Sequence, residues 1–518
     1  MIRTRFPPEP NGYLHLGHLK SIYYNFNYPF DQDSNQKELK LKLKLKECYL
    51  RFDDTNPKTE KKEYVDAILE DLEWLGYKPD HVSYTSDYFN KIADHTRKLI
   101  KDGYVYGDFS TSEEIKEERK IKGSSPYRDM GPEETLKLFD SILNKYDSRN
   151  PILRLRIPVE DRTNECMHDP IIYRMIEEDH YRTGDTYKAY PTYEYSHYIV
   201  DSIEGITHSF CTLEFYIRRP LSFWILDKLG LPRMVIEETN RLLTDFGLLS
   251  KRKIKALLEQ GDLTGWDDPR LLTLKGLRKK GLTPEILKEF CAQQGYTKNM
   301  NAVTNLQSFE AVIRNNLNLQ APRRMAVFNR LKVTLVNFDK VIFMEKPLYP
   351  NQEGKEDQKV ITTLSSTVYI EREDFRLEAN KKYKRWTPAK QVRLKYAGII
   401  KYISHTVDEN GEIDEITAKF ISEESNTEKV NGTIHWVSYH QKNWQELQTR
   451  KLTILSYPDP KKNESGTKEV KEILLDFLEG YSEEGNWQFE RMGYYHLDSN
   501  REITLLVPLK EDNKKNIF

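Results

Sequence analysis

Two histidines near the start of the chain have the types and spacing to bind a phosphate group. His15 and His18 are three residues apart at the predicted start of a helix, and residues 2–6 before them read as a short strand. A proline-rich loop joins these elements, so the chain passes from a strand through a tight turn into a helix start. Unpaired N–H groups and the helix dipole there attract anions, and both imidazoles can reach the same phosphate. Gly17 leaves room for a nucleotide against the backbone.

A lysine-rich loop far downstream offers cations for the same chemistry. It contains Ser250, Lys251 and Arg252 and follows Gly247. Mobile ammonium groups in such a loop can neutralise charge that develops on a transferring phosphate. Each feature alone is a weak signal, because an isolated histidine pair is more often structural and a basic turn is more often only solvated.

In combination, H-L-G-H (15–18) and L-S-K-R-K (249–253) resemble the signature pair of class I aminoacyl-tRNA synthetases. Further long and specific motifs follow in the order typical of glutaminyl-tRNA synthetases along nearly the whole chain: F-P-P-E-P-N-G-Y-L-H, R-F-D-D-T-N-P, G-I-T-H-S-F-C-T-L-E-F and G-W-D-D-P-R. The resemblance implies ATP-dependent ligation of L-glutamine to tRNA(Gln) through a glutaminyl-adenylate, with release of AMP and pyrophosphate.

The reaction that the resemblance implies needs no protein nucleophile. The carboxylate of glutamine would attack the α-phosphorus of ATP, and a terminal ribose 2′-hydroxyl of the tRNA would then take the acyl group. The protein would position the reactants and stabilise charge, with His15 and His18 donating to the phosphates and Lys251 following the charge toward pyrophosphate. The other residues implied at the ATP site are Glu9, Asn11, Gly17, Arg241, Leu242, Ser250 and Arg252. Mg²⁺ would accompany ATP, since the sequence shows no dedicated metal site.

The same resemblance assigns an amino-acid pocket. Asp53 matches the position that binds the α-ammonium group, Tyr193 and His197 match residues that contact the substrate, and Arg5 belongs to the rim. Related glutamyl enzymes of the archaeal and eukaryotic type carry Arg where this chain has Cys211. They also carry P-E-A-S-G instead of P-E-P-N-G and lack a match for His197. A buried cation facing a neutral amide would be left unpaired, so these differences favour glutamine.

Recognition of tRNA is expected at two places. Glu9 and Glu60 match acids near the terminal adenosine of the acceptor end. Four residues match positions that contact the anticodon, where guanidinium and amide groups suit unstacked bases: Arg323, Arg385, Arg393 and Gln488. At the acceptor end the chain departs from the family, because His168 stands where the family has Arg.

Composition is consistent with this interpretation. The chain has 518 residues, 38% hydrophobic and 31% charged, which is typical of a globular protein with several domains. Its net charge of −1 does not exclude RNA, because a neutral protein can carry local basic faces. Four scattered cysteines indicate reduced thiols of a cytoplasmic protein. No apolar run is long enough for a membrane, Met1 leaves no room for a signal peptide, and we expect a monomer.

We predict an α/β Rossmann-type parallel-sheet catalytic domain with an inserted acceptor-binding domain, a helical subdomain and C-terminal all-β barrels. The predicted ranges are 1–82 and 189–250 for the two catalytic halves, the second with the KMSKS-like loop, 83–188 for the inserted domain, 251–320 for the helical subdomain and 321–518 for two anticodon-binding barrels. Residues 26–46, with L-K-L-K-L-K-L-K, read as an insertion on the surface.

Three other interpretations stay open from the sequence alone. A glutamyl-tRNA synthetase, including a non-discriminating form, would share this architecture. A catalytically inactive tRNA-binding homologue would keep the fold, although the intact His15, His18, Lys251 and Asp53 argue against it. A small-molecule nucleotidyltransferase could share H-x-G-H, but the C-terminal β regions and the length of the chain argue against that class.

Overall fold

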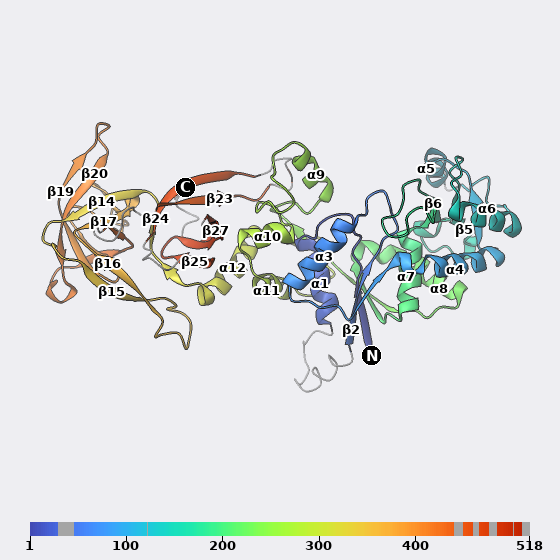
Figure 1. The fold of residues 1–518 in the computed structure, drawn as a ribbon, viewed down its shortest axis with the longest axis horizontal. Coiled ribbons are helices and arrows are strands. Elements are labelled where there is room, and N and C mark those ends of the chain that lie inside the picture. Colours follow the sequence, from blue (N-terminus) through green and yellow to red (C-terminus); the bar gives the residue numbers. More distant parts are fainter. Residues whose placement is uncertain are drawn as a thin grey trace.

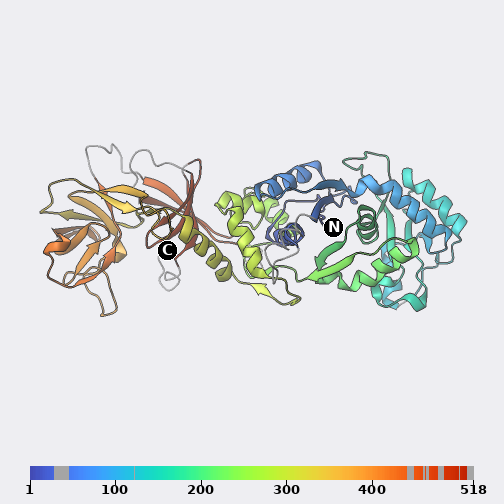
Figure 2. The ribbon, with the colours of Figure 1, turned by 90° about the horizontal axis from the view of Figure 1, so that it is seen from below.

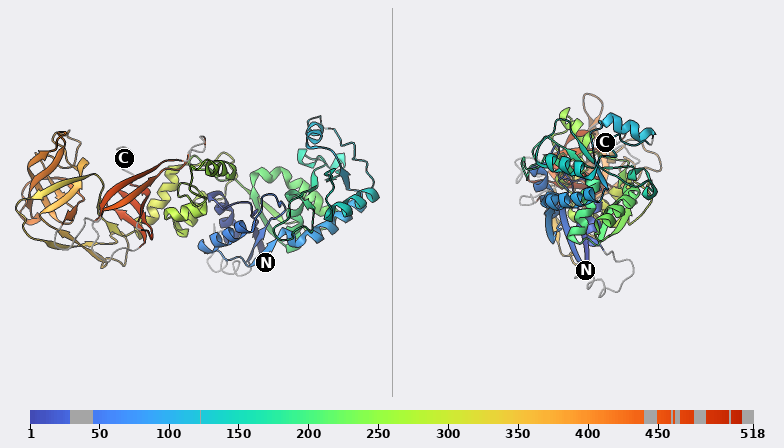
Figure 3. Two further views of the ribbon diagram at one scale, coloured as in Figure 1. Left: turned by 45° about the horizontal axis from the view of Figure 1, so that its top comes forward. Right: turned by 90° about the vertical axis from the view of Figure 1, so that its right-hand side faces the viewer.

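The computed structural model describes residues 1–28, 46–121, 123–439, 449–458, 461, 466–475, 484–500 and 502–509. The molecule is elongated, with an all-β part at one end, helices in the middle and the α/β part at the other end (Figures 1, 2 and 3). Most of the predicted insertion at 26–46 lies outside the described residues. None of the described helices is long and apolar enough to cross a membrane.

A parallel sheet carries the predicted phosphate loop. The strands β1 (Ile2–Phe6), β2 (Lys46–Phe52) and β3 (His81–Tyr84) pair in parallel, as do β8 (His208–Thr212) and β9 (Val235–Thr239). The N–H of Thr207 donates to the carbonyl of Arg3 at 3.0 Å, which joins the two sets. The carboxyl ends of β1 and β2 therefore lie side by side, which is where open α/β sheets bind ligands.

Helices cover this sheet and lead out of it. α1 (Leu16–Asn27) begins where the sequence predicted, and α3 (Lys62–Trp74) follows β2. α7 (Tyr193–Glu204) ends at Gly205, whose left-handed φ of 68° suits glycine. α8 (Arg219–Leu229) lies between β8 and β9 in the chain.

The region inserted between the two halves has its own antiparallel sheet. It consists of β4 (Val105–Asp108), β5 (Ile152–Leu155), β6 (Ile171–Met175) and β7 (Ala189–Pro191) in that order, with α4 (Phe89–Lys101), α5 (Ser112–Ile121) and α6 (Pro132–Asn144). Since β7 pairs with β6, this sheet extends three residues past the predicted boundary at 188. Side chains of α7 and α8 share the hydrophobic core of this region.

Four helices connect the sheet to the all-β part. They are α9 (Lys251–Glu259), α10 (Leu274–Lys280), α11 (Pro284–Gln294) and α12 (Leu306–Gln320), and the short strands β10 (Leu243–Thr244) and β11 (Val303–Thr304) pair beside them. The segment before α10 also supports the phosphate loop. Leu16 donates its N–H to Leu272, and Leu274 donates to Leu14, both at 2.9 Å.

The all-β part contains two seven-stranded mixed sheets. The first has the order β21 (Val430–Ile434), β18 (Gln391–Leu394), β19 (Gly398–Val407), β20 (Ile413–Ile421), β14 (Arg330–Leu335), β17 (Thr367–Glu371) and β22 (Val437–Tyr439). The second has the order β12 (Arg323–Arg324), β25 (Gly485–Phe489), β26 (Gly493–Leu497), β27 (Ile503–Pro508), β23 (Thr449–Leu455), β24 (Lys468–Leu475) and β13 (Ala326–Val327). A hairpin of β15 (Ile342–Pro347) and β16 (Lys359–Leu364) stands apart. Both large sheets keep two edge strands among the described residues, where the sequence predicted barrels.

Candidate functional site

The histidine pair is held by backbone hydrogen bonds at the start of α1. His15 caps the helix, because its Nδ1 accepts from the N–H of Gly17 at 3.1 Å. The N–H of His15 in turn donates to Nδ1 of His18 at 3.1 Å, and the two ring centroids are 3.8 Å apart. A neutral imidazole that accepts at Nδ1 carries its hydrogen on Nε2. No described residue binds either Nε2, so each ring offers one N–H to a ligand.

Both rings are neutral at physiological pH. Burial is the main cause, and the nearby Lys251 and Arg241 add to it, lowering the pKa of His15 to about 3. Burial and the neighbouring His15 place the pKa of His18 well below its usual value. The pair can therefore act as hydrogen-bond donors but not as permanent cations, which leaves positive charge to the lysine loop.

Lys251 lies against the loop that precedes α1. It is the first residue of α9, and its ammonium donates to Oδ1 of Asn11 at 2.6 Å. Nδ2 of Asn11 donates to the carboxylate of Glu9 at 2.6 Å. A Cβ at Gly12 would lie 3.0 Å from Cδ of Lys251, so the absence of a side chain there permits the contact. The pKa of Lys251 is lowered to about 8 by burial, against the opposing effect of Glu9.

Two further predicted residues of this loop stay at its surface. Ser250 occupies the N-cap position of α9 without a capping hydrogen bond from its side chain. Arg252 is exposed in the first turn of the helix. The structure thus brings Glu9, Asn11 and Lys251 into one chain of contacts and leaves the two neighbours of Lys251 outside it.

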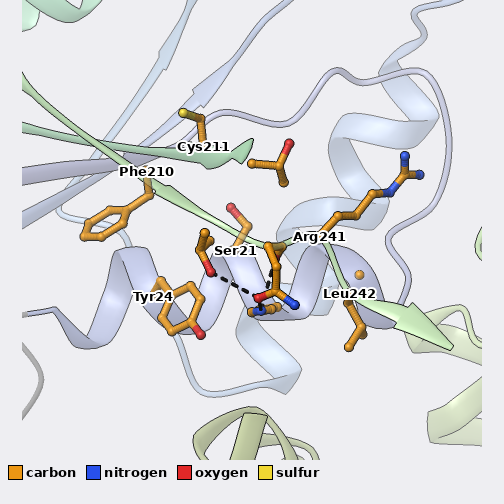
Figure 4. A pocket seen from close by; sticks show the side chains of 11 residues that line it. Ser21, Tyr24, Phe210, Cys211, Arg241 and Leu242 are labelled. Carbon is orange, nitrogen blue, oxygen red and sulfur yellow. Dashed lines mark hydrogen bonds between the residues drawn. The ribbon is translucent and has the colours of Figure 1, made fainter. Parts of the chain in front are cut away.

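A pocket opens between α1, the end of β8 and the segment after β9 (Figure 4). Gly17, Cys211, Arg241 and Leu242, all predicted from the sequence, line it. Sequence reasoning missed the other lining residues, which are Lys20, Ser21, Tyr24, Phe210, Thr212, Thr239 and Asn240. Helical spacing could have found three of them, since positions 20, 21 and 24 follow Gly17 on one face of α1. Cys211, predicted for the amino-acid pocket, lines the same cavity as Arg241 and Leu242.

Residues predicted for the amino-acid pocket meet in a buried network of charges. Arg5 binds Asp201 through two nitrogens, at 3.0 Å each, and Arg51 reaches Asp53, Asp201 and Glu204 at 2.7–3.1 Å. All five side chains are essentially inaccessible to solvent. These contacts hold the pKa of Asp53 and of Asp201 below the ordinary range despite burial.

Asp53 is fully engaged within this network. Its Oδ1 accepts from Arg51 at 3.1 Å and from the hydroxyl of Thr85 at 2.8 Å. Its Oδ2 lies 2.9 Å from Nδ1 of His197, which must donate because an ionised carboxylate only accepts. The ring of Tyr193 lies beside that of His197, with centroids 4.7 Å apart. The predicted pocket residues are thus together, but Asp53 is only 2% exposed.

Glu60 is buried close to the same carboxylates. Both of its carboxylate oxygens accept from the N–H of Asn56 at 3.0 Å. Burial raises the pKa of Glu60 to about 9, and the neighbouring Asp54, Glu9 and Asp53 reinforce the rise. Glu60 is therefore protonated at neutral pH and has a hydrogen to donate.

The four predicted anticodon residues belong to the all-β part, which lies at the end of the molecule opposite the α/β part (Figure 1). Arg323 on β12 pairs with Gln488 on β25. Arg323 is only 3% exposed, because its guanidinium donates to the carbonyls of Ala321 and Asn318 at 2.9 and 2.8 Å. This placement differs from the accessible one that a base contact requires.

The other two predicted anticodon residues are held by ion pairs on the first large sheet. Arg385 pairs with the buried carboxylate of Asp374 at 2.9 Å, which also binds Arg491 from the second sheet. Arg393 pairs with Glu423 at 2.5 Å, and its side chain is 42% exposed. Arg393 is thus the most accessible of the three predicted arginines.

Comparisons with known proteins place this arrangement in a family. Residues 1–319 match the family model of class I tRNA synthetases (E and Q), catalytic domain, and residues 321–421 match the anticodon-binding domain of the same class. The glutamine–tRNA ligase of Idiomarina loihiensis is 39% identical, over 97% of this chain and 90% of that protein. The probable glutamine–tRNA ligase of Dictyostelium discoideum is 38% identical, over 99% of this chain and 66% of that protein.

Among solved structures, a glutamate tRNA ligase from Elizabethkingia meningosepticum in complex with its amino acid matches with a TM-score of 0.44 and 20% identity. That match covers 62% of this chain and 70% of the other. The family model spans well over half of the sequence, and the relatives are similar along nearly all of it. The chain belongs to the class I tRNA synthetases of the E and Q group.

Proposed function

We propose that the chain ligates glutamine to tRNA(Gln) in two steps, through a glutaminyl-adenylate formed from ATP with release of pyrophosphate and then AMP. The observation that carries the proposal is the pair of neutral imidazoles near Lys251 whose Nε2–H groups are bound by no described residue. Donors fixed in advance stabilise charge that develops on phosphate oxygens without rearranging during the step. Glutamine–tRNA ligase relatives at 39% identity supply the substrate class.

ATP would occupy the pocket along α1. The base and ribose would lie against Arg241 and Leu242, and the phosphates would extend toward His15, His18 and Lys251. Among the described residues, no group of three or more His, Cys, Asp or Glu side chains could hold a metal ion. Mg²⁺ would therefore bind mainly through phosphate oxygens and water, and would screen phosphate charge. Lys251 would hold the leaving pyrophosphate.

The charge of the buried network favours glutamine over glutamate. It contains three carboxylates (Asp53, Asp201 and Glu204) against two guanidiniums (Arg5 and Arg51), which gives a net charge of −1 with His197 neutral. Excess negative charge attracts an α-ammonium group. It repels a γ-carboxylate, which would lose its water without gaining a cation.

The proposed tRNA contacts follow the length of the molecule. The acceptor end would enter between the parallel sheet and the inserted region, near Glu9 and Glu60, and the anticodon would lie on the all-β part. Of the predicted residues there, Arg393 and Gln488 are accessible without opening a buried contact. We expect the chain to act on its tRNA as a monomer.

The decisive experiment is aminoacylation of tRNA(Gln) with glutamine and glutamate offered separately. We expect charging with glutamine and little or none with glutamate. Cys211→Arg should lower kcat/KM for glutamine and raise it for glutamate, because a guanidinium there faces a neutral amide without a partner but can pair with a carboxylate. Cys166→Arg, at another partly buried cysteine outside the pocket, is the control.

Two outcomes would contradict the proposal at different points. A wild-type enzyme that prefers glutamate would overturn the assignment of the amino acid. A Cys211→Arg variant that loses glutamine activity without any gain for glutamate would leave the reaction intact and make Cys211 a packing residue. Absence of charging with both amino acids would overturn the proposed activity itself.

A further inference from the structure

Lys20 is a buried lysine in the wall of the nucleotide pocket. It lies on α1, one turn after Gly17, and only 4% of it is exposed. It lines the pocket together with two other residues of the same helix, Ser21 and Tyr24, which are labelled in Figure 4. Its ammonium is 5.6 Å from the centroid of the Tyr24 ring. Neither the proposed reaction nor the family motifs discussed above gives this side chain a role.

In the part of the chain that the structure describes, the ammonium of Lys20 donates hydrogen bonds to Asn240 alone, at two points. It donates to the backbone carbonyl of Asn240 at 3.1 Å and to the side-chain Oδ1 at 2.5 Å. The N–H of Asn240 donates on its other side to the carbonyl of Thr297 at 2.9 Å. Lys20 therefore connects the first catalytic half to the second across the pocket, over 220 residues of sequence.

This arrangement is not explained by stability. No carboxylate among the described residues forms an ion pair with Lys20, and burial lowers its pKa to about 8. A buried ammonium without an anionic partner costs free energy, and an apolar side chain of similar length is often tolerated as well or better in such a place. The presence of a lysine at this position therefore indicates a role in ligand binding and not in stability.

This role follows from the orientation of the Asn240–Arg241 peptide, whose carbonyl accepts a hydrogen bond from Lys20. In a trans peptide the carbonyl and the next N–H point in opposite directions. With the carbonyl of Asn240 bound to Lys20, the N–H of Arg241 points away from the ammonium, and no described residue accepts it. Arg241 itself lines the pocket. The N–H of Arg241 is thus held in one position without an acceptor among the described residues, and we take a ring nitrogen of a purine base as its acceptor in the complex.

We propose that Lys20 is a positioning residue for ATP, which fixes the Asn240–Arg241 peptide across the two halves so that the nucleotide pocket has its binding shape before ATP arrives. This inference rests on the proposed function, because it takes ATP as the occupant of the pocket. Lys20 touches neither the phosphates nor the reacting atoms in this arrangement. Its loss should therefore weaken ATP binding more than it slows the chemical step.

The test compares Lys20→Met with wild type in two measurements, direct binding of ATP by calorimetry and ATP–pyrophosphate exchange with tRNA and glutamine present. We expect Lys20→Met to raise the Kd and KM for ATP about 10- to 100-fold, the factor that accompanies loss of a hydrogen bond from a charged group. The kcat at saturating ATP should change by no more than about threefold. Asn240→Ala should raise the KM less, since the contact to the backbone carbonyl remains.

Lys280→Met is the matched control. Lys280 is 2% exposed, with a pKa also lowered to about 8 by burial, but it packs on the ring of Tyr457 at 3.9 Å and does not line the pocket. We expect its ATP Kd to equal that of wild type. The same rise in both variants would show a general effect of removing a buried lysine and would overturn the proposal.

Three further results would overturn the positioning role, and a fourth would overturn the proposed function instead. An unchanged ATP Kd in folded Lys20→Met, or a fall in kcat without a rise in KM, would overturn the positioning role. If Lys20→Met does not fold, Asn240→Ala decides, and an unchanged ATP Kd there would overturn it too. A wild-type protein that binds no ATP at all would instead overturn the proposed function.

Discussion

The phosphate side and the amino-acid side of the site differ in how far their polar groups are already bound within the protein. On the phosphate side, His15 and His18 use Nδ1 for backbone contacts, and no described residue binds their Nε2–H groups. On the amino-acid side, Asp53 already accepts three hydrogen bonds and is almost inaccessible. One side presents donors to a ligand, whereas the other satisfies its charges internally.

The two sides therefore differ in whether side chains must move before a ligand can bind. Donors on a helix start need no rearrangement to meet phosphate oxygens. A saturated carboxylate can bind an α-ammonium group only where the surrounding side chains move, so part of the binding free energy is used for that change. We therefore expect the nucleotide side to bind its ligand alone and the amino-acid side to depend on a conformational change, with tRNA as the candidate trigger.

The largest expected effect is the loss of unfolding free energy when the charge network of the amino-acid side is broken. Arg51→Met removes contacts to Asp53, Asp201 and Glu204 and leaves these carboxylates buried with fewer partners. Breaking a buried charge network in this way costs about 3–5 kcal/mol of unfolding free energy. Denaturant unfolding measures it. Arg97→Met, which breaks exposed pairs with Asp94 and Asp140 and a distant contact with the ring of Phe139, should cost about 1 kcal/mol or less.

The second largest effect is expected on the rate of adenylate formation at the phosphate side. Lys251→Ala should slow adenylate formation by about 10²–10³-fold, the usual loss for one group that stabilises developing charge. Pyrophosphate exchange with tRNA and glutamine present measures this rate, and tRNA affinity should stay nearly unchanged. Lys255→Ala, at an exposed position of the same helix, is the control. Equal losses of tRNA binding and catalysis would make Lys251 structural and would remove the contrast between the two sides.

A third prediction uses pH to separate the lysine from the histidines. Lys251 acts in its charged form, and its pKa is lowered to about 8, so adenylate formation should fall as pH rises through 8. The fall reaches about tenfold per pH unit at most. His15 and His18 stay neutral down to acid pH and should add no change between pH 6 and 8. In Lys251→Arg the alkaline fall should move to higher pH, and a fall that stays in place would assign it to another group.

The smallest effect is expected for the contact that holds Lys251 in the absence of ATP. Asn11→Ala removes the acceptor of the Lys251 ammonium and its link to Glu9. Because the released ammonium can bind water or a phosphate oxygen instead, we expect the loss of an ordinary hydrogen bond, about 0.5–1.5 kcal/mol, so the KM for ATP should change by roughly 2- to 12-fold. A change as large as that of Lys251→Ala would show that Asn11 binds the nucleotide directly rather than through the lysine.

The residues of the phosphate side could be predicted from the sequence because they lie in short motifs. The helix begins at Leu16 as expected, and Asn11, His15, His18 and Lys251 come together as the motif pair implied. What the motifs could not predict is which ring nitrogen stays free. That depends on the backbone N–H groups of His15 and Gly17 in three dimensions.

The contacts of the amino-acid side could be predicted less well, for a physical reason. The partners of Asp53 come from three separate elements, and each contact depends on how those elements pack. The sequence pointed to Asp53 but not to Arg51, Thr85, Asp201 or Glu204 around it. Arg323 shows the same limit, because its type suits a base contact while its guanidinium is used by the carbonyls at the end of α12.

The long separation between the partners of the charge network has a consequence for how the protein is made. Arg5 is synthesised 196 residues before Asp201, and Arg51 is synthesised 153 residues before Glu204. Until those carboxylates leave the ribosome, the first half of the parallel sheet would have to bury Arg5 without a carboxylate partner and Arg51 with Asp53 alone, which is unfavourable. The inserted antiparallel sheet pairs neighbouring segments, and its core is completed by side chains of α7 and α8, which follow it directly in the chain. The region encoded in the middle of the chain should therefore fold before the sheet that begins at residue 2, so that the nucleotide site forms late during translation.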